Sequence, residues 1–183
     1  MSTAESRQFE RVGGTVLHQG RIVRLVEDTF RFADGVEVQR EIVRHMGAVG
    51  ILVHDGTDLL LTRQPREATG NPNSLEIPAG RLDKPGEEPI ECAKRELAEE
   101  IGRAAAQWQP VFAFQPSVGI LDETVHLFCA WDLSDASADS GEDERIELVR
   151  WPIADIDGAI AATNDGKTLL ALLWAKANGL PGA

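Results

Sequence analysis

The segment Ala79–Gly102 has the sequence AGRLDKPGEEPIECAKRELAEEIG and is the most informative part of the chain. It combines two glycines in a tight loop, a lone carboxylate at Glu87 and a predicted helix with three glutamates near its end. At about 3.6 residues per turn, Glu96, Glu99 and Glu100 project from neighbouring parts of one helix surface. Crowded carboxylates favour a cation, and hard oxygen ligands are those that Mg²⁺ or Mn²⁺ prefers. The alternative is a solvated acidic helix face.

The same segment indicates where its helix begins, where it ends and which face it buries. Pro89 is tolerated in a first helical turn, and Gly102 is a natural C-terminal stop. The predicted core face consists of Ile90, Ala93, Leu97 and Ile101. Glu96 and Glu100 flank that stripe, whereas Glu99 lies roughly opposite its centre. Glu96 and Glu100 are therefore the better candidates for direct metal ligands.

Gly80, Glu87 and the run Arg95–Gly102 resemble the signature of the Nudix hydrolases. In the family pattern five residues separate the glycine from the glutamate, and seven more precede REUXEEXGU, where U is a bulky aliphatic residue. This chain has six residues between Gly80 and Glu87, and Arg103 stands at the final U. The spacing from Glu87 to the end of the helix is intact, so the metal-binding geometry is expected to survive.

This resemblance implies a divalent-metal site and names its ligands. Mg²⁺, with Mn²⁺ as the alternative, would be held by the main-chain carbonyl of Ala79 and by the carboxylates of this signature, which is called the Nudix box. These carboxylates are Glu87, Glu96, Glu99 and Glu100. Glu99 would bind a second ion or act through water. Arg95 is implied to orient one of the carboxylates, so Glu99 and Arg95 also count as catalytic candidates.

Composition sets bounds on the rest of the prediction. At 183 residues and 43% hydrophobic content, the chain is expected to form one domain with a small appendage. It has neither an apolar run approaching the roughly 20 residues of a membrane span nor a signal-peptide core, which predicts no membrane partner. The net charge of −12 disfavours nucleic acid but leaves a small phosphorylated substrate open. Cys92 and Cys129 are predicted to be reduced core residues of a cytoplasmic protein. A zinc site is not expected, because it would need more ligands close together.

Residues 1–45 have the pattern of a small β-structure. Period-two alternation flanks an Asp34-Gly35 turn, which is a strong hairpin signal. The predicted strands are 15–18, 21–32 and 36–45. Strands this short bury too little to be stable alone. ADP-ribose pyrophosphatase-like Nudix proteins have a small dimerisation domain here, so the resemblance implies a homodimer. The alternative is that these strands extend the main sheet.

The resemblance implies that residues 46–183 form the Nudix domain itself. Met46–Val53 and Leu59–Gln64 flank an Asp55-Gly56 turn and are predicted to form a buried central hairpin. The further predicted elements are strands at 75–80, 108–114, 124–132 and 145–151, helices at 153–162 and 167–178, and a polar loop at 133–144. The predicted fold class is α+β, a Nudix α/β/α sandwich with a mixed central sheet plus a small N-terminal antiparallel β-domain.

Three residues are candidates for binding the substrate. Related enzymes carry an Arg-Gln-aromatic-Arg stretch whose arginines meet the substrate phosphates, and Arg63 and Arg66 match it, with Pro65 replacing the aromatic residue. A guanidinium suits this role because it grips phosphate oxygens in a bidentate way. The alternative is a surface salt bridge with Glu67 or with the box helix. Glu76 lies in a run that resembles the family's ElPAG, and it either points into the site or occupies an exposed strand position.

Glu123 is the candidate general base. The loop Gln115–Glu123 resembles the one that carries a proposed catalytic glutamate in several ADP-ribose pyrophosphatases, and Glu123 falls on that position. The alternative is a plain carboxylate at a strand edge. A signature proline of ADP-ribose-specific members falls on Val118, and Pro116 lies two residues earlier. This departure concerns the substrate and leaves the reaction class unchanged.

The combined resemblance covers most of the chain, up to the helix that begins Lys167-Thr168-Leu169-Leu170. It implies metal-dependent hydrolysis of the pyrophosphate bond of ADP-ribose or a related nucleoside diphosphate sugar, giving a nucleoside monophosphate and a sugar phosphate. GDP-mannose and other dinucleotide or nucleoside-diphosphate derivatives remain alternatives. A non-catalytic ADP-ribose-binding Nudix module is another alternative, although every box carboxylate is present. RNA decapping would need a basic track that this acidic chain does not show.

Overall fold

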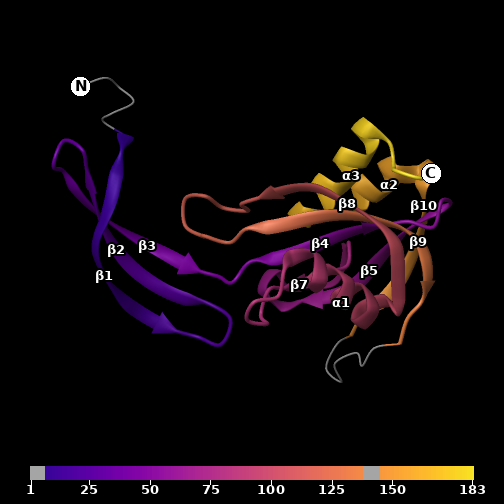
Figure 1. Cartoon of the computed structure of the whole chain (residues 1–183), viewed down its shortest axis with the longest axis horizontal. Helices are drawn as coiled ribbons and strands as arrows, with labels where there is room; N and C mark the ends of the chain where they lie inside the picture. Colours follow the sequence, from indigo (N-terminus) through magenta and orange to yellow (C-terminus); the bar gives the residue numbers. More distant parts are fainter. Residues whose placement is uncertain (1–6, 138–144) are drawn as a thin grey trace. The chain divides into compact units, whose positions relative to one another are not determined.

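The computed structural model describes residues 7–137 and 145–183, which form two compact units (Figure 1). The smaller unit contains the chain up to Met46 together with Gln115–Thr124. The larger unit contains Gly47–Phe114 and Val125–Ala183. The loop that carries Glu123 therefore belongs to the same unit as the N-terminal strands.

The smaller unit is built on one antiparallel sheet in the order β1-β2-β3. Its strands are β1 (Phe9–Gln19), β2 (Arg24–Phe32) and β3 (Glu37–Arg44). Gly35, with a φ of 86°, occupies the predicted turn between β2 and β3, where its amide donates to the carbonyl of Phe32. Because these strands form a sheet of their own, the alternative that they extend the main sheet is wrong.

The larger unit contains two sheets, in the orders β10-β5-β6 and β7-β4-β9-β8. Their strands are β4 (Ala48–Val53), β5 (Asp58–Arg66), β6 (Asn71–Glu76), β7 (Ala79–Arg81), β8 (Arg103–Phe114), β9 (Val125–Asp135) and β10 (Glu147–Pro152). The helical elements are η2 (Glu67–Thr69), α1 (Pro89–Ile101), η3 (Ile153–Asp155), α2 (Ile156–Ala162) and α3 (Gly166–Asn178). The second sheet is mixed, because β4 pairs in parallel with β9 and antiparallel with β7.

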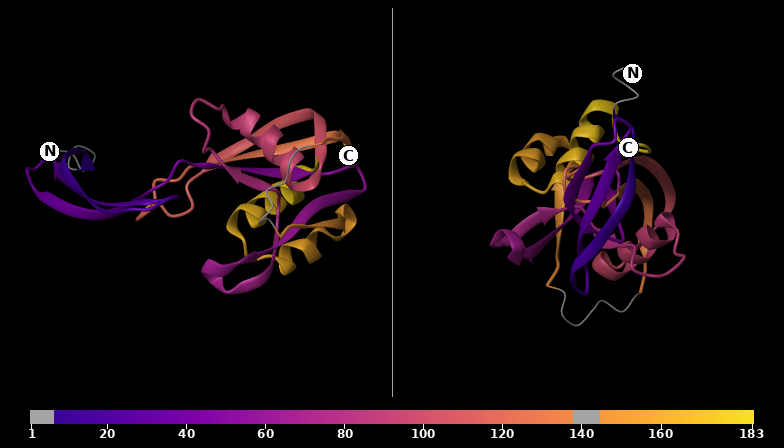
Figure 2. Two further views of the ribbon diagram at one scale, coloured as in Figure 1. Left: turned by 90° about the horizontal axis from the view of Figure 1, so that it is seen from below. Right: turned by 90° about the vertical axis from the view of Figure 1, so that its left-hand side faces the viewer.

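Two apolar clusters hold these layers together. One gathers residues of β4, β5, β9, α2 and α3, including Leu52, Leu61 and Leu172, and the other joins β4 and β9 to α1 through residues such as Ile51 and Leu97. Burying a side chain of this size stabilises the fold by about 1.5–3 kcal/mol. Within this unit the strands lie between α1 on one side and α2 and α3 on the other (Figure 2). The predicted α+β architecture is confirmed.

The predicted central hairpin is wrong. β4 and β5 meet only at an isolated bridge between His54 and Leu59, and beyond it they belong to different sheets. Asp55 stabilises the turn, since its Oδ1 accepts hydrogen bonds from the amides of Thr57 and Asp58. A strand that is buried on both faces shows a continuous apolar run, and such a run carries no information about its lateral partner.

Smaller differences concern the ends of elements. β6 begins at Asn71, before the strand predicted at 75–80, and β9 continues to Asp135, inside the polar loop predicted at 133–144. Part of the predicted polar loop, residues 138–144, lies outside the described residues, as do residues 1–6. None of the helices in the two described ranges is long and apolar enough to cross a membrane.

Candidate active site

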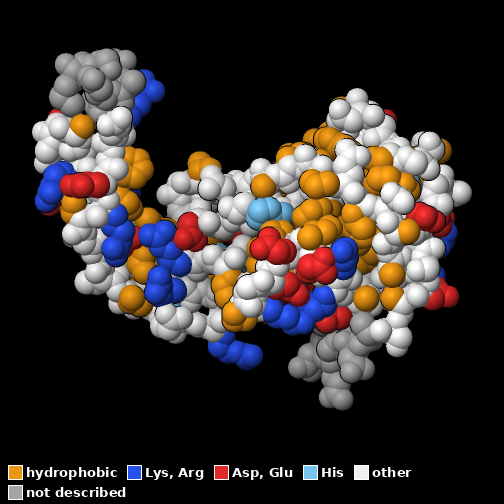
Figure 3. Space-filling model, viewed as in Figure 1, with side chains coloured by type: hydrophobic (Ala, Val, Ile, Leu, Met, Phe, Trp, Pro, Cys, Tyr) orange, Lys and Arg blue, Asp and Glu red, His pale blue; other side chains and the backbone are white. Residues whose placement is uncertain are grey.

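Helix α1 presents the box side chains beside a buried apolar stripe. It starts at Pro89 and is followed by Gly102 in the left-handed conformation with a φ of 64°, as predicted. Its buried residues are Cys92, Ala93 and Leu97, with Ile90 and Ile101 packed against the same cluster. Both cysteines of the chain are free and buried, which agrees with their predicted core role. Acidic and basic side chains gather over β7 and α1 in Figure 3.

Arg95 lies at the centre of the box and contacts three of its glutamates. Its Nε and Nη2 donate to the two oxygens of Glu87 at 3.0 and 2.9 Å. Its Nη1 donates to Glu96 Oε1 at 2.6 Å and to Glu99 Oε2 at 2.9 Å. These hydrogen bonds raise the pKa of Arg95, and those to Glu87 lower the pKa of that carboxyl group. The sequence predicted one oriented carboxylate, and the structure gives three.

The loop in front of the helix brings Ala79 and Gly80 against the remaining box residues. The amide of Ala79 donates to Glu100 Oε2 at 3.0 Å. Gly80 lies against the side chain of Glu96, and a Cβ at this position would overlap the Glu96 carboxylate. The sequence predicted a glycine for the sake of a tight turn. In the structure Gly80 is required by the close approach of Glu96, since its φ is not positive.

The donor set suits a divalent cation in chemistry and charge. Glu87, Glu96 and Glu99 share one guanidinium, and hard carboxylate oxygens are the ligands of Mg²⁺ and Mn²⁺. Within residues 7–137 and 145–183, no three acidic, histidine or cysteine side chains are grouped so that they could hold an ion as they stand. In this arrangement the glutamate oxygens contact Arg95 and the amide of Ala79.

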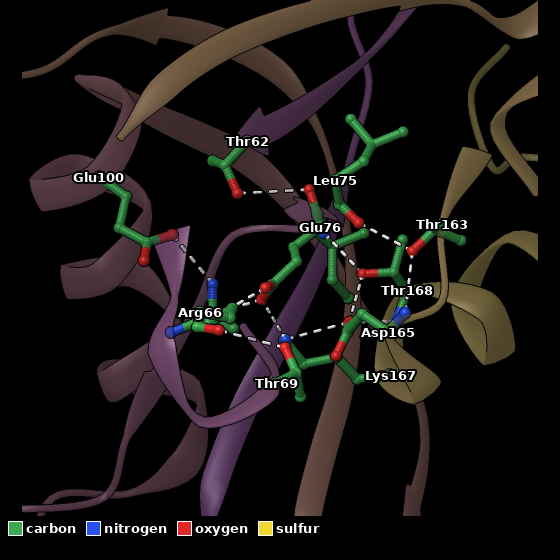
Figure 4. Close-up of polar contacts among 12 residues, drawn as sticks. Thr62, Arg66, Thr69, Leu75, Glu76, Glu100, Thr163, Asp165, Lys167 and Thr168 are labelled. Carbon is green, nitrogen blue, oxygen red and sulfur yellow. Dashed lines mark hydrogen bonds and ion pairs between the residues drawn. The ribbon is translucent and has the colours of Figure 1, made fainter. Parts of the chain in front are cut away.

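Arg66 and Glu76 form a second polar group in the same unit (Figure 4). Glu76 ends β6 and is only 1% exposed, so the alternative of an exposed strand position is wrong. Its Oε1 accepts from Arg66 Nε and its Oε2 from Arg66 Nη2, both at 2.6 Å. Lys167 Nζ donates to the same Oε2, also at 2.6 Å. Burial alone would raise the pKa of Glu76, but hydrogen bonds from Arg66 and the charge of Lys167 lower it to about 2.

The start of α3 supports this group. Asp165 Oδ2 accepts from the amide of Thr168 at 3.0 Å and from its hydroxyl at 2.6 Å, and it lies 3.0 Å from Lys167 Nζ. The hydroxyl of Thr168 in turn accepts from the amide of Ile77 at 2.8 Å. The N-terminus of α3 is therefore tied to the strand end that leads to Ala79.

The two predicted arginines differ in their surroundings. Arg66 pairs with Glu76, not with Glu67 or with the box helix, although the charge of Glu100 acts on it. Arg63 makes no side-chain hydrogen bond or ion pair within the described residues. Lys167 was not among the predicted site residues. It lies 91 positions from Glu76, and only its place at the start of a capped helix distinguishes it in the sequence.

Glu123 lies in the smaller unit, where it and its neighbour Asp122 contact the end of β3 and the residue after it. Its Oε1 lies 3.1 Å from Nδ1 of His45. Asp122 accepts from Arg44 Nη1 at 2.9 Å and from the amide of His45 at 2.8 Å. Main-chain hydrogen bonds join Val43 to the same loop. The predicted role of Glu123 as a base stays a prediction.

Comparison with known proteins places the chain in a family. The NUDIX domain model matches residues 44–172. An ADP-ribose pyrophosphatase of Bacillus subtilis is 35% identical over 175 residues, which cover 93% of this chain and 94% of that protein. A GDP-mannose pyrophosphatase of Yersinia enterocolitica is 36% identical over 173 residues, covering 86% of this chain and 90% of that protein. The fold resembles that of a solved ADP compounds hydrolase, with a TM-score of 0.82 and 23% identity over 93% of this chain and 94% of that one. The chain therefore belongs to the Nudix family, as a pyrophosphohydrolase of the branch that includes the ADP-ribose pyrophosphatases.

Proposed function

We propose that this protein hydrolyses the pyrophosphate bond of ADP-ribose or a closely related nucleoside diphosphate sugar, with Mg²⁺ as its ion. The arrangement of Arg95 among the box glutamates is the observation that carries the proposal, because it gathers hard oxygen donors from α1 and from the loop before it. The similarity to the Bacillus subtilis ADP-ribose pyrophosphatase extends over nearly the whole chain and supports this choice of substrate. Mn²⁺ is the alternative ion.

The reaction divides into tasks for particular residues. A water oxygen attacks one phosphorus, the bond from that phosphorus to the bridging oxygen breaks, and the bridging oxygen leaves with the second phosphate. The bound divalent ions would polarise phosphoryl oxygens and lower the pKa of the attacking water. Glu87, Glu96, Glu99 and Glu100, with the carbonyl of Ala79, would hold these ions. Arg95 would keep these carboxylates oriented.

The substrate is held and activated by residues outside the helix. Arg66 and Arg63 would bind phosphate oxygens, because a guanidinium is always charged and donates in a planar fork. Glu123 would accept a proton from the attacking water. We expect Glu123→Gln to lower kcat by about 10²-fold or more, which is the usual scale for a general base, and to leave Mn²⁺ affinity unchanged. Unchanged turnover, or lost ion affinity, would reject this role.

GDP-mannose is the second candidate substrate, because the Yersinia enterocolitica relative covers almost as much of the chain. The proposal also includes a homodimer formed through the N-terminal strands, which leave apolar side chains such as Phe9 and Val16 exposed. A cytoplasmic location agrees with the two free, buried cysteines. Light scattering on the purified protein tests the dimer, since a monomer mass would contradict it.

One experiment tests the proposed reaction. The purified protein is incubated with Mg²⁺ and, separately, with ADP-ribose, ADP-glucose, GDP-mannose, a dinucleoside polyphosphate and a nucleoside triphosphate, and the products are identified. AMP and ribose 5-phosphate from ADP-ribose are the expected products. Preferred release of GMP and mannose 1-phosphate would favour the second candidate. Saturable binding of ADP-ribose without hydrolysis would reject the enzyme in favour of a binding module.

A further inference from the structure

We propose that Glu76 and Lys167 are positioning residues, which hold the guanidinium of Arg66 so that its outer edge faces a phosphate of the substrate. This inference rests on the proposed function, in which Arg66 binds the substrate. It assigns Glu76 an indirect role, because its carboxylate is buried and both of its oxygens already accept hydrogen bonds from Arg66. It adds Lys167, which lies on α3 and far from the box in the sequence.

The geometry of the pair leaves one edge of Arg66 for a ligand. Glu76 engages the Nε and Nη2 edge through two hydrogen bonds of 2.6 Å, which is the planar bidentate arrangement. The Nη1 atom has no hydrogen-bond partner in the part of the chain that the structure describes. Glu76 is 1% exposed whereas the side chain of Arg66 is 42% exposed, so one edge faces the interior and the other faces outward. A guanidinium fixed in this way loses little further freedom when it binds an anion.

Lys167 adjusts the charge of this group as well as its geometry. Its side chain is 16% exposed and contacts both Glu76 and Asp165. With Lys167 present, two cations, Arg66 and Lys167, balance two carboxylates. Without Lys167 the same group would carry a net negative charge beside the position proposed for a phosphate. Repulsion at this partly buried site would weaken substrate binding.

The start of α3 fixes Lys167 in turn. Asp165 caps the helix and contacts Lys167, and Thr168 joins this cap to the amide of Ile77, next to Glu76 (Figure 4). The contacts close a ring from Glu76 through Lys167, Asp165 and Thr168 back to Ile77. The ring holds the end of β6, which leads within three residues to Ala79 and its hydrogen bond with Glu100.

Steady-state kinetics with ADP-ribose and Mg²⁺ test the proposal through single and double variants. We expect Glu76→Gln and Lys167→Met each to raise KM about tenfold while kcat stays within about threefold, because they weaken binding that is equal in the ground and transition states. Arg66→Ala should raise KM at least as much. In the Arg66→Ala background, adding Glu76→Gln should change KM by less than about twofold, since Glu76 acts through Arg66, whereas Lys167→Met should keep only the part of its effect that comes from charge repulsion. Lys167→Arg, which keeps the charge, should restore KM to within about threefold of the wild type.

The control is Lys176→Met, because Lys176 also lies on α3 and pairs with a carboxylate, Asp157, at the surface. We expect it to leave KM unchanged. Full additivity of the substitutions in the Arg66→Ala background would overturn the proposal, as would an unchanged KM in Lys167→Met. Because Glu76 is fully buried, the variants at Lys167 keep the test independent of any loss of folding in Glu76→Gln. A wild-type protein that hydrolyses none of the nucleotide sugars would instead reject the proposed function.

Discussion

Arg95 connects the chemistry of the box to its structure at the scale of single residues. One guanidinium contacts Glu87, Glu96 and Glu99, and this sharing explains how three carboxylates can lie close together. Like charges this close would otherwise repel each other strongly at a partly buried site. An entering divalent ion would relieve the same repulsion. Under the proposed function, Arg95 would balance the charge of these carboxylates as well as orient them.

Glu76 predicts a pH dependence of stability that can be measured apart from catalysis. Its pKa falls from 4.5 to about 2 on folding. Because the folded pKa lies below the unfolded one, the stabilisation is complete above about pH 4.5 and is lost as the pH falls toward 2, and its size is about 3 kcal/mol. We expect the unfolding free energies of wild type and Glu76→Gln to differ by about this amount at pH 7 and to converge in acid. Urea titrations from pH 7 to pH 3 measure it, and a difference that does not change with pH would contradict it.

The loop Gln115–Thr124 shows how an element takes its place from a partner outside its own sequence neighbourhood. It connects β8 and β9 of the larger unit but belongs to the smaller one, where it forms main-chain hydrogen bonds with Val43. Arg44 extends this attachment, since it bridges Asp122 of the loop and the buried Asp28 of β2. The N-terminal sheet is thus a support for the segment that carries Glu123.

Arg44→Met should loosen this loop without unfolding the protein. Arg44 supplies a charged donor to Asp122, and the same carboxylate accepts from the amide of His45. We expect amide hydrogen exchange at Asp122 and His45 to speed up by about tenfold, which corresponds to about 1.4 kcal/mol of lost local protection. Amides in α1 should exchange as in the wild type. Arg31→Met is the control, since Arg31 pairs with Glu37 and Glu10 in the same sheet. Equal effects of the two substitutions would show that the loop does not depend on Arg44.

Elements with local sequence signals could be predicted, whereas contacts between residues far apart in the sequence could not. The ends of α1 follow from Pro89 and Gly102, and its buried face follows from apolar residues at helical spacing. The hairpin expected of β4 and β5 failed, because a turn at Asp55 fixes where a strand ends but not which strand it joins. In the same way the sequence showed Glu76 but not its partner Lys167, since nothing local relates residues 91 positions apart.

At the scale of the whole molecule, the charged groups of the proposed site lie outside the apolar clusters that form the core of the larger unit. The chain carries a net charge of −12, and yet the groups proposed to bind substrate include Arg66 and Arg63. Two apolar clusters build the larger unit, and no box glutamate belongs to either. Glu96 and Glu100 flank the apolar stripe of α1, in which Ala93 and Leu97 are buried. We therefore expect the core to stay folded whether or not an ion is bound.

This separation predicts that removing the ion stops the reaction and preserves the fold. In excess chelator we expect hydrolysis of ADP-ribose to fall by more than about 100-fold, while the far-ultraviolet circular dichroism stays that of the folded protein. Mg²⁺ should stabilise the folded protein only by mass action, and the melting temperature should rise accordingly. The expected gain in unfolding free energy is about 2.7 kcal/mol when the Mg²⁺ concentration is 100 times its dissociation constant. Glu96→Gln should reduce both the activity and this Mg²⁺-dependent stabilisation, whereas Glu91→Gln, on the exposed start of the same helix, should change neither. Unfolding in chelator would contradict the prediction, because it would mean that the ion, and not the two apolar clusters, holds the larger unit together.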